Sequence, residues 1–136
     1  MKGMKMKATV IIERGSDGFY SCYCEQKFDG FSLYGYGDTA EEAKEDLQSA
    51  YAEFKEDFAK EGREVPELEF TWKYDLSSLF SYFSVLNVSE LARKCEINPS
   101  QLRQYRSGLA KASESTYDKI RKAIHSIGEE LSQAVI

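Results

Sequence analysis

The chain has 136 residues, and its 18 lysines and arginines against 23 aspartates and glutamates give a formal net charge of −5. This balance excludes a general nucleic-acid binder, in which basic residues predominate over the whole chain. No stretch approaches the roughly 20 apolar residues of a membrane helix, and no signal-peptide cleavage pattern follows the basic start. We therefore expect a cytoplasmic protein without a membrane partner.

Charge and composition both change along the chain. Residues 1–70 contain 9 basic and 16 acidic residues, whereas residues 71–136 contain 9 and 7. The chain is long enough for two small, independently folding modules. We predict an α+β domain over residues 1–74 and an all-α domain over residues 75–136.

The first part of the chain has the pattern of three strands. Lys7–Arg14 alternates apolar and polar side chains, residues 15–18 supply a turn, and Phe19–Glu25 returns as an aromatic-rich strand. Phe31–Gly37 has the pattern of a third strand. The first two strands are expected to form a hairpin.

A helix and a fourth strand complete the predicted first domain. Thr39 and Glu42 form a capping-box pattern, Gly62 ends the helix, and Glu67–Tyr74 is the fourth strand. The resulting β-β-β-α-β order places one helix on one face of the sheet and leaves the other face open. The apolar stripe expected to bind the sheet consists of Ala40, Ala43, Leu47, Tyr51, Phe54 and Phe58.

The pattern does not indicate catalytic or metal-binding chemistry. Carboxylates on or beside the strands could hold the metal ions of a nuclease, but they do not close into one constellation. Cys22, Cys24 and Cys95 lack the spacing of metal ligands. We expect no catalytic residue, no metal and no cofactor, and hence no enzyme. The carboxylates considered are Glu13, Glu25, Asp29 and Asp38.

Residues 87–108 have the pattern of two short helices joined by a tight turn. Asn87 and Asn98 can each cap a helix that has glutamate or glutamine at its third position. Pro99 favours the start of the second helix, and Gly108 ends it as a left-handed cap. This arrangement is typical of a helix-turn-helix, which usually binds duplex DNA.

The second of these helices carries the side chains expected to contact DNA. Leu102 and Tyr105 turn inward, so the remaining polar side chains are available to base edges and phosphates. Residues 91–111 contain five basic residues against a single acidic one, Glu96. The alternative is a helical bundle that only resembles this motif. The expected DNA-binding side chains are Ser100, Gln101, Arg103, Gln104, Arg106 and Lys111.

Residues 76–127 resemble the helix-turn-helix of the phage-repressor-like family, through Glu90-Leu-Ala before the turn and Ile97 after it. The family commonly has glycine where this chain has Glu96. A residue other than glycine must accept a left-handed conformation there or bend the turn differently. The residues that the resemblance implies to face the DNA groove are Pro99, Ser100, Gln101, Arg103 and Gln104.

The first domain also resembles a known family. Val10-Ile-Ile-Glu, Gly18-Phe-Tyr-Ser and above all Gly35-Tyr-Gly-Asp-Thr-Ala-Glu-Glu-Ala-Lys-Glu-Asp-Leu are similar to the HicB antitoxins. The resemblance implies a partial RNase H-like domain joined to a DNA-binding domain. It further implies that the chain is the antitoxin of a type II toxin–antitoxin pair. Such an antitoxin blocks a small HicA-like RNase toxin and represses the shared operon by binding operator DNA. The alternative is a stand-alone helix-turn-helix regulator with an α+β sensing or oligomerisation domain.

The last helical segment carries more apolar residues than one small domain is expected to need. Helix-turn-helix proteins usually bind two half-sites, so we expect a homodimer or a higher homo-oligomer. Alternatively, this stripe packs only on its own domain, against Leu76, Leu79, Phe80 and Phe83. The stripe consists of Tyr117, Ile120, Ile124, Ile127 and Leu131.

Overall fold

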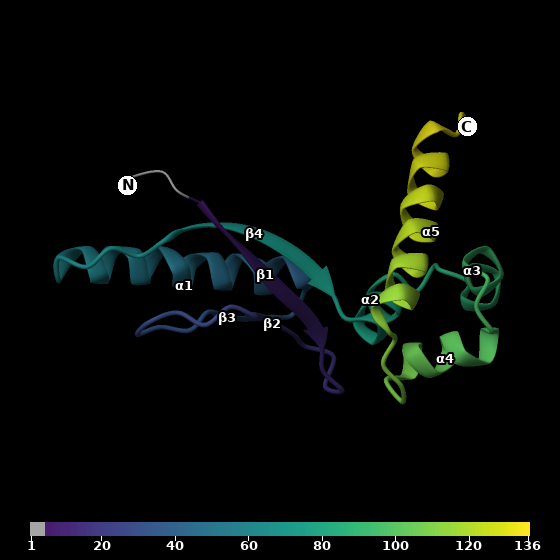
Figure 1. Cartoon of the computed structure of the whole chain (residues 1–136), viewed down its shortest axis with the longest axis horizontal. Helices are drawn as coiled ribbons and strands as arrows, with labels where there is room; N and C mark the ends of the chain where they lie inside the picture. The colour runs from purple at the N-terminus through teal and green to yellow at the C-terminus, as the bar shows by residue number, and fades with distance from the viewer. Residues whose placement is uncertain (1–4) are drawn as a thin grey trace. The chain divides into compact units, whose positions relative to one another are not determined.

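The computed structural model describes residues 5–136. The protein is α+β, as expected. The strands are β1 (Lys5–Arg14), β2 (Tyr20–Cys24), β3 (Tyr34–Gly37) and β4 (Glu67–Tyr74), with helix α1 (Ala40–Lys60) between β3 and β4 (Figure 1). The helices that follow are α2 (Leu76–Tyr82), α3 (Val88–Cys95), α4 (Pro99–Ser107) and α5 (Glu114–Gln133).

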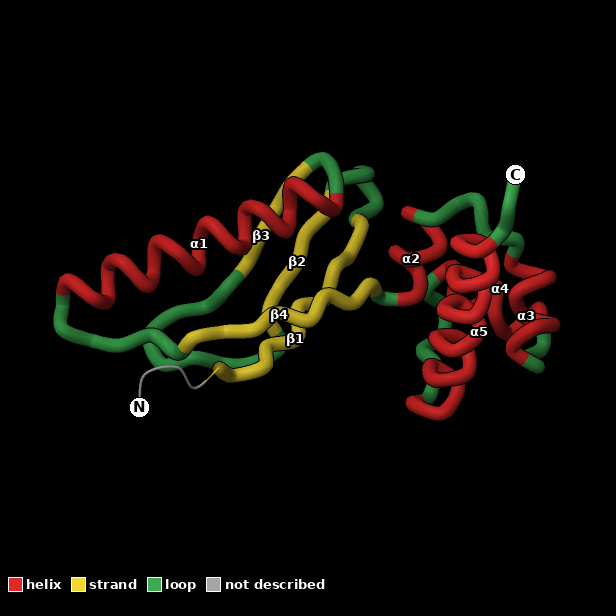
Figure 2. Tube along the Cα trace, turned by 90° about the horizontal axis from the view of Figure 1, so that it is seen from above, coloured by secondary structure: helices red, strands yellow, loops and turns green. Residues whose placement is uncertain are grey.

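The four strands form one mixed sheet in the order β3-β2-β1-β4. β1 pairs antiparallel with β2 and parallel with β4, so Val10 lies opposite both Cys24 and Trp72. Alternate side chains of β1 point to one face, where Ala8, Val10 and Ile12 are fully buried. α1 covers this face, and Figure 2 shows it lying alongside β3. β4 is the strand at the opposite edge of the sheet.

Two glycines of β3 allow α1 to approach the sheet closely. A Cβ atom on Gly35 would overlap the carbonyl oxygen of Ala43 and lie 2.7 Å from the backbone nitrogen of Leu47. A Cβ on Gly37 would lie 2.8 Å from the backbone nitrogen of Ala43. Backbone packs directly on backbone here, which only residues without a side chain permit.

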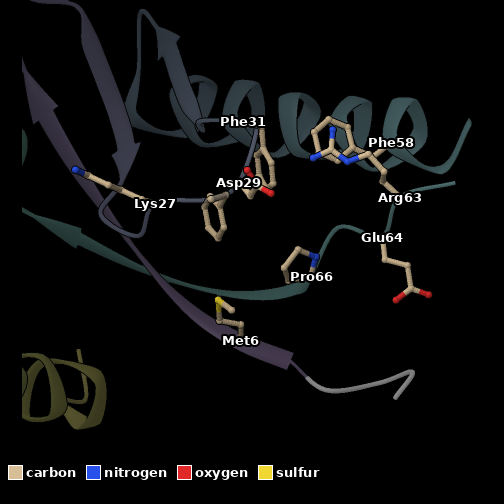
Figure 3. Close-up of a pocket in the computed structure, with 9 residues that line it drawn as sticks. Met6, Lys27, Asp29, Phe31, Phe58, Arg63, Glu64 and Pro66 are labelled. Carbon is tan, nitrogen blue, oxygen red and sulfur yellow. The ribbon is translucent and has the colours of Figure 1, made fainter. Parts of the chain in front are cut away.

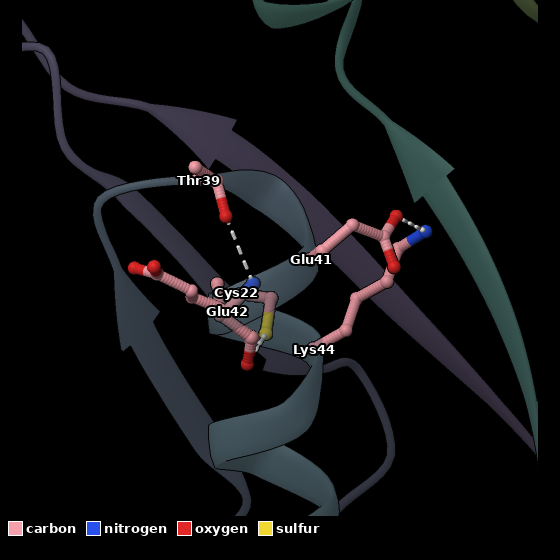
Figure 4. Close-up of polar contacts among 6 residues, drawn as sticks. Cys22, Thr39, Glu41, Glu42 and Lys44 are labelled. Carbon is pink, nitrogen blue, oxygen red and sulfur yellow. Dashed lines mark hydrogen bonds and ion pairs between the residues drawn. The ribbon is translucent and has the colours of Figure 1, made fainter.

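The start of α1 is capped by its own first turn. The Thr39 hydroxyl accepts a hydrogen bond from the Glu42 N–H at 3.1 Å, as the sequence predicts. The Glu42 carboxylate accepts from the N–H of Asp38 at 2.8 Å, one residue earlier than a standard capping box requires. Figure 4 shows Thr39 and Glu42 at the first turn of the helix.

Cys22 connects β2 to the same turn. Its thiol donates to the Ala43 carbonyl at 3.2 Å (Figure 4). Burial, and then the negative charge of Asp46, raise the pKa of this thiol to about 11. Cys22 is therefore neutral near pH 7 and acts as a small core residue, not as a nucleophile.

The third strand is shorter than predicted. Phe31 and Leu33 precede it and are buried. The N–H of Cys24 donates to the Leu33 carbonyl at 3.2 Å, and Phe31 forms an isolated antiparallel bridge with Phe28. Phe31 stacks on Phe28 at 4.7 Å between ring centroids and contacts Phe54 of α1 at 5.2 Å. Phe31 thus reaches the core through ring packing on α1, with only a local bridge to Phe28 in place of a continuous strand.

The chain divides into two compact units inside α2, with Ser78 the last residue of the first unit and Leu79 the first of the second. Ser78 is 2% exposed. Its hydroxyl accepts from the N–H of Arg14 at 2.7 Å and donates to the Asp75 carboxylate at 3.0 Å. These bonds join the segment after β4 to the end of β1, so the first unit continues beyond residue 74, where the sequence placed the boundary.

The second unit has a small helical core. Leu91 and Ala92 of α3, Leu102 of α4 and Ile120 of α5 are each at most 3% exposed. α3 contacts both α4 and α5. Ala92 is fully buried, which is consistent with the small side chain that closely crossing helices require.

The substitution Gly35→Ala tests the close approach of α1 to β3. The added methyl group must displace the backbone of α1, so we expect a loss of about 2 kcal/mol or more in the free energy of unfolding. Gly128→Ala is the matched control, because Gly128 lies within α5 and a Cβ there meets nothing within 4 Å. This control should gain up to ~1 kcal/mol. Urea denaturation followed by circular dichroism measures both, and equal effects would contradict the close approach.

Candidate nucleic-acid interface

α3 has a side-chain cap at its start and a left-handed residue at its end. The Asn87 side chain accepts from the N–H of Glu90 at 3.0 Å. At the other end Glu96 is left-handed, with φ 58° and ψ 41°, and the N–H of Ile97 donates to the Ala92 carbonyl at 2.9 Å. Of the two conformations that the sequence allowed for Glu96, the chain therefore adopts the left-handed one.

α4 ends with the same hydrogen-bonding pattern, but at a glycine. Gly108 has φ 81°, and the N–H of Leu109 donates to the Gln104 carbonyl at 3.0 Å. The predicted left-handed cap at Gly108 is confirmed. Glu96 is the one residue other than glycine with positive φ among the described residues 5–136. The left-handed conformation of Glu96 lowers the stability of the fold by about 1 kcal/mol relative to glycine, which adopts it without steric cost.

The start of α4 differs from the predicted capping box. Asn98 caps the helix, but its side chain accepts from the N–H of Ser100 at 2.8 Å. Gln101 does not fold back to the cap, because its side-chain amide donates to the hydroxyl of Tyr105 at 2.7 Å. Tyr105 is 5% exposed, so its hydroxyl holds the Gln101 side chain along the flank of α4.

The exposed face of α4 lies opposite its buried residues. Leu102 is fully buried and Tyr105 nearly so, and helical spacing places Ser100, Arg103 and Gln104 on the opposite side. All three are exposed. The same spacing adds Ser107, which was not among the predicted contacts; it follows Arg103 by four positions and is exposed. The Ser107 hydroxyl donates to the Gln104 carbonyl at 3.0 Å.

The other predicted site residues lie around this face. Pro99 is half-buried at the start of α4. Gln101 and Arg106 are exposed, but helical spacing places them on the flanks, nearer to the buried residues. Lys111 is exposed in the segment between α4 and α5. Four of the predicted residues thus surround a narrower central group of three on α4.

The basic side chains of the second unit differ in whether a carboxylate pairs with them. Arg93, Lys94 and Arg121 are occupied by carboxylates, at 2.9 Å from Glu90, 3.4 Å from Glu130 and 2.8 Å from Asp118 respectively. Within residues 5–136, no carboxylate forms an ion pair with the basic residues of α4 or of the segment after it. Their positive charge is therefore available to an external anion. These residues are Arg103, Arg106 and Lys111.

The first unit has an open depression near the turn between β2 and β3 (Figure 3). Aromatic rings form part of its lining, and the Arg63 guanidinium lies 4.3 Å from the centroid of the Phe58 ring. Asp29 and Glu64 are the carboxylates at its rim. No three histidine, cysteine or carboxylate side chains among the described residues are grouped so as to hold a metal ion.

The apolar stripe of α5 is only partly buried. Ile120 is 1% exposed and Ile127 is half-buried, whereas Leu131 is 69% exposed. The end of the stripe near the C-terminus of α5 is thus not covered within its own unit.

Burial raises the pKa of Cys95 on α3, so this thiol too remains neutral near pH 7.

No protein-family model, no curated protein and no solved structure matches this chain. None of the helices in residues 5–136 is both long and apolar enough to span a membrane.

Glu96 and Gly108 provide a matched pair of substitutions at equivalent left-handed positions. Glu96→Gly should raise the free energy of unfolding by about 1 kcal/mol, because glycine adopts this conformation without steric cost. Gly108→Ala should lower it by about the same amount for the opposite reason. Urea denaturation of the two variants measures both changes. A destabilising Glu96→Gly would show that the carboxylate makes a compensating contact.

Proposed function

We propose that this chain is the antitoxin of a HicA/HicB-like type II toxin–antitoxin system. In this proposal the second unit represses the shared operon, and the first unit, as a partial RNase H-like domain, neutralises a small RNase toxin. The observation that carries it is the exposed face of α4, where Ser100, Arg103 and Gln104 project opposite a buried side. The sequence resemblance to HicB supplies the link between this face and an antitoxin.

The DNA-binding part of the proposal rests on side-chain chemistry. Arginine and glutamine form bidentate hydrogen bonds with guanine and adenine respectively, which suits Arg103 and Gln104 to base recognition. Arg106 and Lys111 would contact phosphates, since both are exposed and neither forms an ion pair within residues 5–136. The carboxylate of Glu96 opposes binding by repelling phosphate.

The toxin-binding part rests on charge and on the uncovered face of the sheet. Residues 1–70 carry 9 basic and 16 acidic residues, which complements a basic, RNA-binding partner. On the face away from α1, Tyr34 and Tyr36 are 54% and 66% exposed. Exposed aromatic residues are frequent at protein interfaces. We assign the chain itself no catalytic role.

The second candidate is a stand-alone transcriptional regulator whose first unit senses a ligand. The depression lined by Phe28, Phe31 and Phe58 favours it, because small-molecule sites combine aromatic walls with a few charged groups. The two candidates differ in their genomic setting. A short basic reading frame beside the gene favours the antitoxin, and its absence favours the regulator.

Substitutions on α4 test the proposed DNA contact. Arg103→Ala and Gln104→Ala should each weaken operator binding by about 1–3 kcal/mol and reduce discrimination between operator and random DNA. Lys111→Ala should weaken binding to all sequences alike and reduce the salt dependence. Fluorescence anisotropy with operator and scrambled duplexes at several salt concentrations measures these effects.

Arg121→Ala is the control for the loss of positive charge. It removes an exposed arginine whose guanidinium is already paired with Asp118 at 2.8 Å, so operator binding should change little. If Arg103→Ala and Gln104→Ala affected operator and random DNA equally, α4 would not be the helix that reads the sequence.

The toxin contact is tested by co-expression with the product of the neighbouring short reading frame. The complex should survive deletion of residues 79–136, because Ser78 and its bonds to Arg14 and Asp75 are retained. The full-length double variant Arg103→Ala, Gln104→Ala should also bind the toxin normally. Affinity purification followed by inhibition of RNA cleavage gives the readout. Loss of the complex in the truncated chain, while the double variant still forms it, would place the toxin contact in the second unit.

A further inference from the structure

The two edges of the sheet are protected differently. β3 spans only Tyr34–Gly37, and the Asp46 carboxylate accepts the outward-directed N–H of Tyr36 at 2.9 Å. β4 is twice as long, and within residues 5–136 no strand lies beyond it. Exposed edges of this length pair readily with another strand unless they are blocked. The unblocked edge of this sheet is therefore β4.

The direction of the β4 backbone follows from three hydrogen bonds. The N–H of Asp75 donates to the Ile12 carbonyl of β1 at 3.2 Å, so odd-numbered residues direct their backbone groups toward β1. Even-numbered residues direct theirs outward, since N–H and C=O groups alternate along a strand. In agreement, the N–H of Leu68 and the carbonyl of Pro66 bond outward to the Tyr51 hydroxyl, at 2.9 and 2.6 Å.

The outward backbone groups of Phe70 and Trp72 are the part of this edge that no side chain covers in the described chain. Tyr51 closes the edge only as far as Leu68. The Phe70 and Trp72 side chains lie on the side of the sheet that faces α1, and their ring centroids are 5.5 Å apart. Even with this contact, both residues are only half-buried. Both the backbone and the aromatic surface at this point are left incompletely packed.

We propose that the β4 edge pairs with β4 of a second copy of this chain, antiparallel and centred on Thr71. This pairing depends on β4 alone and does not rest on the proposed function. Phe70 then lies opposite Trp72 of the second copy, and the reverse pair is related by the two-fold axis. Each pair exchanges both backbone hydrogen bonds, because both residues direct their groups outward.

Side-chain charge and packing suit this register. On the open face of the sheet, Glu69 lies opposite Lys73 of the second copy, twice by symmetry, and both residues are exposed. Opposite charges at such cross-strand positions stabilise pairing. On the other face, Phe70 and Trp72 of the two copies form aromatic pairs, which favour strand association in the same way.

The neighbouring two-fold registers are less favourable. Pairing centred on Phe70 would set Leu68 opposite Trp72, although the Leu68 N–H is already bonded to Tyr51 at 2.9 Å. Pairing centred on Trp72 would place Glu69 opposite Asp75 and Lys73 opposite Thr71, so it would join no opposite charges. Pairing centred on Thr71 also brings Glu67 opposite Asp75 at its ends, but there Glu67 is already paired with Lys55 at 2.8 Å. Centring on Thr71 alone uses the uncovered backbone groups and joins opposite charges.

A single cysteine substitution tests the register. In a non-hydrogen-bonded antiparallel pair the Cα atoms lie about 4.5 Å apart, within the range of a disulfide. Full-length Thr71→Cys should therefore form a covalent dimer on mild oxidation. Glu69→Cys is the matched control, because the two copies of residue 69 would be about 13 Å apart. We expect at least about tenfold more cross-linked dimer from Thr71→Cys on a non-reducing gel. The unsubstituted chain, oxidised in parallel, reports any linkage through the three native cysteines.

Charge substitutions in the Thr71→Cys background test the opposed pairs. Glu69→Lys sets two lysines opposite each other and should reduce the cross-linked fraction severalfold. Adding Lys73→Glu restores opposite charges and should restore the linkage. Lys119→Glu, an exposed substitution on α5, is the charge control and should leave it unchanged.

Three results would overturn the proposal. The first is equal linkage of Thr71→Cys and Glu69→Cys. The second is a dimer in sedimentation that forms no Thr71→Cys disulfide, which would assign self-association to another surface, such as Ile127 and Leu131 of α5. The third is a Thr71→Cys chain that stays monomeric alone but is protected from oxidation by the co-expressed product of the neighbouring reading frame, which would assign β4 to a different protein.

Discussion

The direct contact between α1 and β3 is the constraint on which the first unit depends. Gly35 and Gly37 have no side chain between the strand and the helix, so the backbone of α1 packs on the sheet without a spacer. The Cys22 thiol then reaches the Ala43 carbonyl, and Thr39 caps the helix where it meets the sheet. Any larger residue at Gly35 would push the helix away and open the core over Val10 and Ile12.

The position of α1 has a consequence at the opposite side of the sheet. Because the helix lies mainly on β3 and β2, it does not extend fully over β4, whose apolar side chains remain half-buried. The end of β4 near Leu68 is closed by Tyr51, whereas Phe70 and Trp72 keep both ring surface and backbone groups available. The helix contact that completes the core therefore also determines which edge of the sheet is left for association.

The second unit depends on two helix ends with the same backbone geometry. Gly108 adopts the left-handed conformation without cost, while Glu96 adopts it as a residue with a side chain. On either side of this turn Leu91, Ala92 and Leu102 are buried, and α3 contacts α4. The left-handed conformation of Glu96 therefore costs stability at the turn before α4. The Glu96 carboxylate also lowers the positive charge near the exposed face of α4.

Local chemistry in the sequence determined the α+β class, the caps at Thr39, Asn87 and Asn98, and the left-handed end at Gly108, because each depends on residues within one or two turns. Helical spacing around Leu102 and Tyr105 also determined which side of α4 is exposed. The tertiary structure alone decided the late start of β3, where the Phe31 ring packs on α1 and its backbone forms only an isolated bridge with Phe28. It also decided that Gln101 bonds to Tyr105 instead of the cap, that Ser78 belongs to the first unit, and that the β4 edge is uncovered. These features depend on where distant segments meet and on which hydrogen-bonding groups remain unpaired once they do, and neither is encoded in the periodicity of a single segment.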